Sequence, residues 1–100
     1  MDFKIINNKG IFEIHGDFTN IQTNQVADYF SNLLDKYYEI IICLKQVDKI
    51  DNTAIKVIRS IAAKARRRSK ILFVLGKENE NITKQLKKAN LNIYKNDYAN

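Results

Sequence analysis

The sequence predicts one small α/β domain: a mixed sheet of four or five strands that opens with a hairpin and has helices packed on it. Two apolar segments typical of buried strands, 38–44 and 71–75, alternate with amphipathic helical patterns. A shorter alternating segment at the start predicts the hairpin. We expect a single domain over residues 1–100, because a chain of this length supports one core and leaves no room for a second.

The first two strands are expected at 3–7 and 11–15, where apolar and polar residues alternate. The residues between them include Asn8 and Gly10, which tolerate the unusual backbone angles of a tight turn. The pair is therefore predicted to be antiparallel.

Residues 16–20 break this alternation, and a helix is predicted over 22–36. Thr19 or Asn20 is expected to cap its first turn, since both types accept hydrogen bonds from free backbone N–H groups. Apolar residues recur at helical spacing: Val26, Tyr29, Phe30, Leu33 and Leu34.

The second half of the chain is predicted to supply the parallel strands. The nearly continuous apolar run 38–44 is typical of a central strand covered on both faces. We expect a loop over 45–51 anchored by Val47 and Ile50, a helix over 52–67, a strand over 71–75 ended by Gly76, and a helix over 81–89. The inward positions of the 52–67 helix are expected to be Ile55, Ile58, Ile61, Ala62 and Ala65, and a closing segment is expected at Leu91, Ile93 and Tyr94.

Cysteine content and hydropathy limit the location of the protein. Cys43 is the only cysteine, so an intrachain disulfide and a paired-cysteine zinc motif are excluded, which favours a reducing, cytoplasmic location. The start of the chain lacks the pattern of a signal peptide. Even the longest apolar runs, such as 40–44, are far shorter than the roughly 20 residues of a membrane-spanning helix. We expect no direct membrane insertion.

Signatures of enzymes are absent from the sequence. It contains no Gly-rich phosphate loop, no nucleophile elbow and no two-His zinc motif. His15 is the only histidine and is expected in a strand, and Cys43 lies inside an apolar run, where a small buried hydrophobic role is expected. We therefore expect a protein that is not an enzyme, without a cofactor or a small-molecule substrate.

The helix predicted over 52–67 is strongly basic, and the chain carries a net charge of +6. The simplest interpretation of Lys56–Arg68 is a solvated face whose final residues complement the negative end of the helix dipole. An alternative is nucleic-acid binding through Arg66, Arg67 and Arg68. The absence of aromatic residues between 52 and 70 disfavours that alternative, because stacking on bases needs them.

The polar turn Asp51-Asn52-Thr53 follows Ile50 and opens the basic helix. All three residue types suit the start of a helix, so a simple helix cap is one interpretation. The residues around the turn suggest another. The segment from Ile40 to Ile55, Ile-Ile-Ile-Cys-Leu-Lys-Gln-Val-Asp-Lys-Ile-Asp-Asn-Thr-Ala-Ile, resembles the strand and S-G-V-x-x-I-D-S-S-G-L motif of the STAS domain family. His15-Gly16-Asp17-Phe18-Thr19 is similar to the family's G-x-L-D turn, and the order of elements also agrees.

The resemblance to anti-sigma factor antagonists of this family implies a regulatory binding module that a partner kinase switches by phosphorylation. The second hydroxyl residue of D-S-S-G, which the kinase modifies, corresponds to Thr53. The partner, an anti-sigma factor with serine kinase activity, would contact the residues around the turn: Thr19, Asn20, Asp51, Asn52, Ala54 and Ile55. The sequence departs from the family pattern at Thr19, Cys43 and Ala54, where Asp, Asp and Gly are usual.

A second resemblance is to standalone STAS subunits of ABC complexes that transport membrane lipids. In that case Thr53 would be a contact residue for the ATPase subunit and would not be modified.

Overall fold

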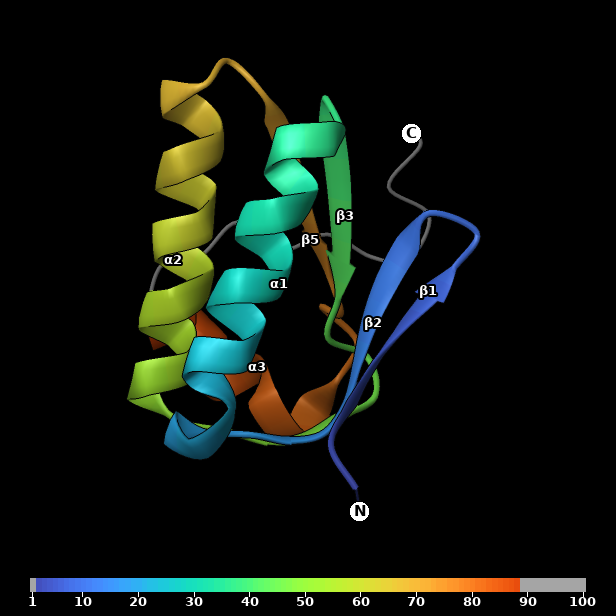
Figure 1. The fold of residues 1–100 in the computed structure, drawn as a ribbon. Helices are drawn as coiled ribbons and strands as arrows, with labels where there is room; N and C mark the ends of the chain where they lie inside the picture. The colour runs from blue at the N-terminus through green and yellow to red at the C-terminus, as the bar shows by residue number, and fades with distance from the viewer. Residues whose placement is uncertain (1, 89–100) are drawn as a thin grey trace.

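The computed structural model describes residues 2–88, and the predicted closing segment at Leu91, Ile93 and Tyr94 lies outside them. The chain forms a hairpin, a helical segment, two strands, a helix, a strand and a last helix (Figure 1). Their bounds are β1 Lys4–Asn8, β2 Ile11–Phe18, η1 Asn20–Gln22, α1 Thr23–Lys36, β3 Glu39–Cys43, β4 Val47–Ile50, α2 Asn52–Arg67, β5 Ile71–Leu75 and α3 Glu80–Lys88. Strands alternating with helices confirm the predicted α/β class.

The five strands form one mixed sheet in the order β1-β2-β3-β5, and β4 pairs with the far end of β2. The hairpin β1–β2 is antiparallel, whereas β2–β3, β3–β5 and β2–β4 are parallel. The hairpin turn has the expected chemistry, since Lys9 and Gly10 both have positive φ and the Asn7 side chain accepts a hydrogen bond of 2.9 Å from the Gly10 N–H. The prediction of a hairpin followed by parallel strands is therefore confirmed.

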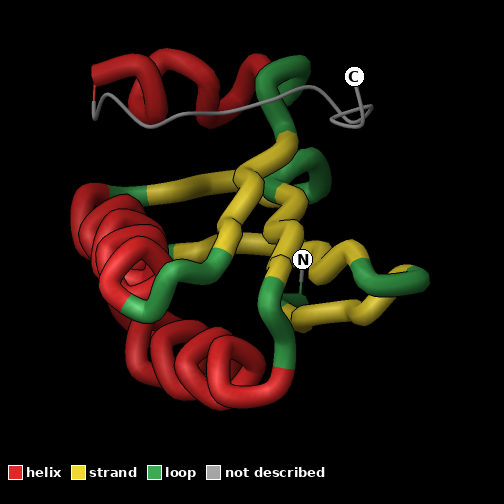
Figure 2. Tube along the Cα trace, turned by 90° about the horizontal axis from the view of Figure 1, so that it is seen from above, coloured by secondary structure: helices red, strands yellow, loops and turns green. Residues whose placement is uncertain are grey.

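Helices cover the sheet unequally. Helices α1 and α2 lie side by side on one face (Figure 1), and the strands separate this pair from α3 (Figure 2). Helix α3 packs against β4 through Ile82 and Leu86, both fully buried. The arrangement leaves the start of α2 close to the side of α3.

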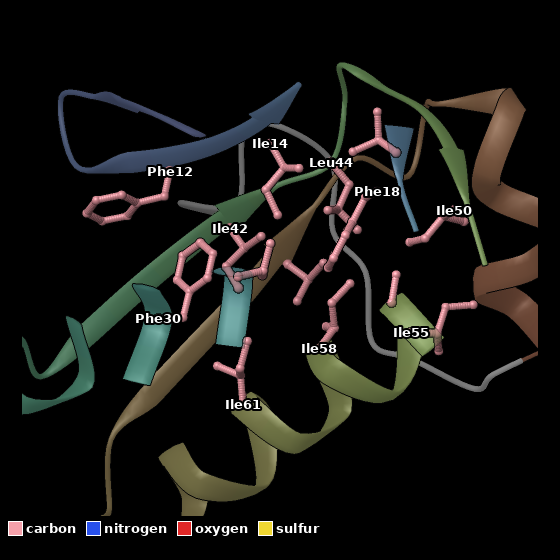
Figure 3. Packing of buried hydrophobic residues seen from close by; sticks show 14 of the residues in the cluster. Phe12, Ile14, Phe18, Phe30, Ile42, Leu44, Ile50, Ile55, Ile58 and Ile61 are labelled. Atoms are coloured by element: carbon pink, nitrogen blue, oxygen red, sulfur yellow. The ribbon is translucent and has the colours of Figure 1, made fainter. Parts of the chain in front are cut away.

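The main core lies between β2–β3–β4 and the inner faces of α1 and α2 (Figure 3). Alternate β2 residues point into it, as period-two patterning requires, and isoleucines of α2 meet them at helical spacing. Phe30 of α1 is fully buried and stacks edge-on against Phe12 and Tyr29. The core residues labelled in Figure 3 are Phe12, Ile14, Phe18, Phe30, Ile42, Leu44, Ile50, Ile55, Ile58 and Ile61.

Three details of the sequence prediction were wrong. The segment expected as a loop, 45–51, contains the strand β4, because a register shift between Gly16 and Asp17 extends β2 to Phe18 and offers β4 a parallel partner. Neither Thr19 nor Asn20 caps α1, since a short 3-10 helix intervenes and the N-cap is Gln22. Ala62, expected inside, is only half-buried.

Candidate functional site

The ends of β2 and β4 bring two polar turns together. The two strands are parallel neighbours with Phe18 paired to Ile50, so their carboxyl ends lie at the same edge of the sheet. The chain after β2 begins with Thr19 and Asn20, and the chain after β4 begins with Asp51. In open α/β sheets this edge is where binding sites usually form. Four residues predicted from sequence, Thr19, Asn20, Asp51 and Thr53, are therefore close in space.

Asp51 connects the two turns and caps α2. Its Oδ1 accepts a hydrogen bond of 2.9 Å from the backbone N–H of Ala54, as an N-cap residue should. Its Oδ2 accepts a bond of 3.1 Å from the backbone N–H of Asn20, thirty-one residues earlier in the chain. One carboxylate thus satisfies a free N–H of the helix and fixes the β2–η1 turn against it.

The electrostatic environment of Asp51 favours its charged form. Burial alone would raise the pKa of this carboxyl, but hydrogen bonds from the Thr53 hydroxyl and from the N–H groups of Ala54 and Asn20 outweigh it. The pKa of Asp51 therefore lies below its ordinary value of 3.8. A carboxylate at this position also interacts favourably with the positive end of the α2 dipole.

Thr53 lies on the surface in the first turn of α2. Its hydroxyl donates a hydrogen bond of 2.6 Å to Oδ1 of Asp51, and the residue is exposed, as is Asn52. The next two residues are not exposed, because the side chains of Ala54 and Ile55 are buried in the core. The exposed surface at the start of α2 is therefore formed by Asn52 and Thr53, with Ala54 and Ile55 beneath it.

The β2–η1 turn has its own internal hydrogen bonds. The side-chain oxygen of Gln22 accepts hydrogen bonds from the Thr19 N–H at 3.0 Å and from the Thr19 hydroxyl at 3.2 Å. Thr19 is half-buried, whereas Asn20 is exposed. These bonds and the Asn20–Asp51 bond hold the turn in one conformation beside the start of α2.

Ile21 is a surface residue that the sequence interpretation missed. It is 84% exposed, the largest exposure among the large apolar side chains of residues 2–88, and it follows Asn20 directly. Single exposed apolar side chains are common on protein surfaces, and it is the position of Ile21, directly after Asn20, that makes it a candidate contact residue at this edge of the sheet. The signal in the sequence was an isolated Ile one position before the predicted helix, off its apolar spacing.

The basic residues of α2 divide into two groups. Just after the end of the helix, Arg68 forms an ion pair of 2.5 Å with Asp35, and Lys70 donates to the backbone oxygen of Leu34, so both connect the segment between α2 and β5 to the end of α1. At its start, Lys56 and Arg59 are exposed and border a cleft of about 440 Å³ between α2 and α3. The cleft is lined by Asn52, Ile55, Lys56, Arg59, Gln85 and Lys88.

The environments of Cys43 and His15 indicate structural roles. Cys43 is buried, as predicted, and desolvation raises the pKa of its thiol. The ring Nε2 of His15 lies 2.8 Å from Oε1 of Glu13, and both side chains are partly buried on β2. Within residues 2–88, no group of three or more His, Cys, Asp or Glu side chains is arranged to hold a metal ion. No helix in that range has the length and hydropathy needed to cross a membrane.

The chain belongs to the STAS domain family, whose model matches residues 1–95. Solved structures share the fold. A Thermotoga maritima protein described as an anti-sigma factor antagonist superimposes on this chain with a TM-score of 0.75 at 17% identity, and the match covers 98% of this chain and 88% of that one. The anti-sigma factor antagonist SpoIIAA in its unphosphorylated form gives a TM-score of 0.67 at 9% identity, covering 93% and 87%.

A further relative comes from a different functional setting. A sulfate transporter family protein of Wolinella succinogenes gives a TM-score of 0.60 at 24% identity, covering 83% of this chain and 69% of that one. A comparison with curated protein sequences gives no match. At these identities the similarities establish the fold, and the function has to be argued from the site.

Proposed function

We propose that this protein is a regulatory binding module of the anti-sigma factor antagonist type, which binds a kinase-like protein partner and is switched by phosphorylation of Thr53. The observation that carries the proposal is the hydrogen bond of 2.6 Å between the exposed Thr53 hydroxyl and Asp51, the residue that also holds Asn20. A change at Thr53 therefore acts directly on the residue that joins the two turns.

The surface around the two turns suits a protein partner. It combines an exposed apolar side chain, Ile21, with exposed polar groups at Asn20, Asn52 and Thr53. Protein interfaces commonly have an apolar contact surrounded by polar residues. The turns are fixed by hydrogen bonds before binding, so little ordering of the backbone would oppose association.

Phosphorylation would change this surface in a defined way. Transfer of the γ-phosphoryl group of ATP to Oγ1 of Thr53 releases ADP and removes the hydroxyl proton, so Thr53 can no longer donate to Asp51. The phosphate brings about −1.5 to −2 charges next to a carboxylate that is already ionised. The helix dipole would partly compensate inside the free protein. In an interface closed to water, the added charge would oppose binding.

A second candidate function follows from the resemblance to standalone STAS subunits and from Ala54, which stands where the family pattern has Gly. In this case the same turns would dock permanently on the ATPase subunit of an ABC complex for membrane lipids, and Thr53 would serve as a contact residue only. Both functions use one surface, and they differ in whether Thr53 is modified.

The two functions are separated by isolating the partner and then assaying modification. The protein with Thr53 unchanged, and the variants Thr53→Glu and Ser60→Glu, are used as immobilised baits in an extract of the source cells. Ser60 is exposed on the same helix and controls for charge alone. The purified partner is incubated with the protein and ATP, and phosphate is mapped by mass spectrometry. Phosphate on Thr53 and loss of binding only in Thr53→Glu are expected.

A stable complex in which Thr53 stays unmodified would overturn the switch. If the partner in that complex is a transporter ATPase, the second function is supported.

A further inference from the structure

We infer that the cleft between α2 and α3 is a docking groove for an acidic segment of the protein partner. The inference rests on the proposed function, since it assigns the chemistry of the partner that binds at the start of α2. It concerns a surface separate from the Thr53 hydroxyl, which is not among the residues that line the cleft.

The charge of the cleft is of one sign. Lys56 and Arg59 border it from α2 and Lys88 from α3, and no acidic side chain of residues 2–88 lines it. Within residues 2–88, neither Lys56 nor Arg59 makes an ion pair. The sequence itself has no acidic residue between Asp51 and Glu78, so α2 offers no internal counter-charge.

The positive charges of Lys56 and Arg59 lower the stability of the free protein, and an acidic ligand would restore it. Lys56 and Arg59 are three residues apart, the spacing at which like charges on a helix repel each other. The basic residues at the other end of the helix differ in position, because Lys64, Arg66 and Arg67 lie in the last turn, where the negative end of the dipole stabilises them, and Arg68, the C-cap, is paired with Asp35. Lys56 and Arg59 lie in the first half of the helix, where the dipole gives no such compensation.

The cleft also has the position and the lining of a protein-binding groove. Ile55, which is buried, is one of its lining residues, and the Gln85 and Asn52 amides add groups that can both donate and accept hydrogen bonds. Asn52 connects the cleft to the turn that carries Thr53. A partner seated on the turn would therefore extend directly into the cleft.

An acidic protein segment fits these features better than a nucleic acid does. In the part of the chain that the structure describes, no aromatic side chain lines the cleft, so these residues offer no platform on which bases could stack. The three cations occupy one short groove, whereas a nucleic-acid backbone is usually followed by an extended basic track. Side-chain carboxylates spaced along a peptide match both the short length and the sign of the charge.

Matched charge reversals on one helix test the inference. The groove variant carries Lys56→Glu and Arg59→Glu, and the control variant carries Arg66→Glu and Arg67→Glu, which are exposed residues of the same helix outside the cleft. Both variants change the net charge equally. Circular dichroism and urea unfolding establish that each remains folded.

The probe is a short fluorescein-labelled peptide of alternating glutamate and serine, with a glutamine version as its uncharged counterpart. Anisotropy titrations are made at about 50 mM and about 200 mM salt, together with inorganic phosphate and a labelled single-stranded DNA. We expect the glutamate peptide to bind the unchanged protein and the control variant, and to bind the groove variant at least about tenfold more weakly. In spectra of the ¹⁵N-labelled protein, the amide signals of Asn52 and Gln85 should shift.

Equal weakening in both variants would show a general charge effect and overturn the groove. Absence of peptide binding at the lower salt, or tighter binding of the DNA than of the peptide through the groove residues, would also overturn it. The assay uses neither ATP nor a kinase, so its failure leaves the phosphorylation of Thr53 untouched. Likewise, an unmodified Thr53 leaves the result for the groove unchanged.

Discussion

The backbone N–H of Asn20 donates a hydrogen bond of 3.1 Å to Oδ2 of Asp51 and joins the end of β2 to the start of α2. The same carboxylate accepts a bond of 2.9 Å from the Ala54 N–H and one of 2.6 Å from the Thr53 hydroxyl. Asp51 is therefore both a helix cap and the connection between two turns. Its removal should affect more than the first turn of the helix.

Substitution of Asp51 by Ala should lower the free energy of unfolding by about 2 kcal/mol, at the upper end of the range for N-cap residues, since the Asn20 contact is lost together with the cap. Urea unfolding followed by circular dichroism measures this loss. Asp48→Ala is the matched control, because Asp48 is an exposed residue of β4. Equal losses in both variants would show that the Asp51 contacts contribute nothing specific.

The contribution of Asp51 should depend on pH in the acidic range. Its pKa is lower in the folded protein than its ordinary value of 3.8, so the folded state favours the ionised form. The stabilisation is therefore fully present above about pH 5, well above the ordinary pKa, and is lost as the pH falls through the folded-state pKa. The difference in unfolding free energy between the unchanged protein and Asp51→Asn, measured at several pH values, should be constant from neutral pH to about pH 5 and then decrease. A difference that grows on acidification would contradict the lowered pKa.

Substitution of Asn79 should lower the free energy of unfolding more than substitution of most other polar residues. Its side-chain nitrogen donates to the backbone oxygens of Leu44 and Val47, both at 2.8 Å, and only 8% of the residue is exposed. Asn79→Asp would set a carboxylate against those oxygens and should cost at least about 3 kcal/mol. Asn81→Asp makes the same chemical change at an exposed position in the first turn of α3, where it should be neutral or slightly stabilising. Similar unfolding midpoints for the two variants would contradict the role of Asn79.

The aromatic contacts of α1 predict a large effect in the core. Phe30 is fully buried, with ring centroids 6.1 Å from Phe12 and 5.2 Å from Tyr29. Phe30→Ala should cost about 3–5 kcal/mol, because it removes buried area and leaves a cavity. Tyr38→Ala, at a residue that is 66% exposed, should change stability by less than about 0.5 kcal/mol. Thermal or urea unfolding of both variants measures the contrast.

Hydropathy patterning predicted most of the fold, since α2 at Asn52–Arg67 and β5 at Ile71–Leu75 have the predicted bounds. Strand β4 was missed because its buried residues, Val47 and Ile50, stand three positions apart and do not alternate. Such a short strand becomes recognisable only through its pairing with β2, and pairing of distant segments is not visible in local periodicity.

Only part of the candidate site could be predicted, because contacts between distant segments are not visible in the local sequence. The turn 51–53 could be located from its polarity and motif, but the Asn20–Asp51 bond and the cleft between α2 and α3 arise from contacts between distant segments. Ile21 was missed for a local reason. Its exposure depends on the short 3-10 helix at Asn20–Gln22, which the apolar spacing of the predicted helix does not indicate. Asn79 likewise appeared as one polar residue among several in a connecting segment.

The central claim is that phosphate on Thr53 controls the binding of a protein partner at the Asp51 turn. The most direct measurement is the dissociation constant of the purified partner for the unmodified protein and for protein carrying phosphothreonine at position 53, with phosphoserine at Ser60 as the control. We predict that phosphate at Thr53 weakens binding by about 5-fold to 150-fold, while phosphate at Ser60 leaves it nearly unchanged. Equal dissociation constants for the unmodified protein and the Thr53-phosphorylated protein would contradict the account.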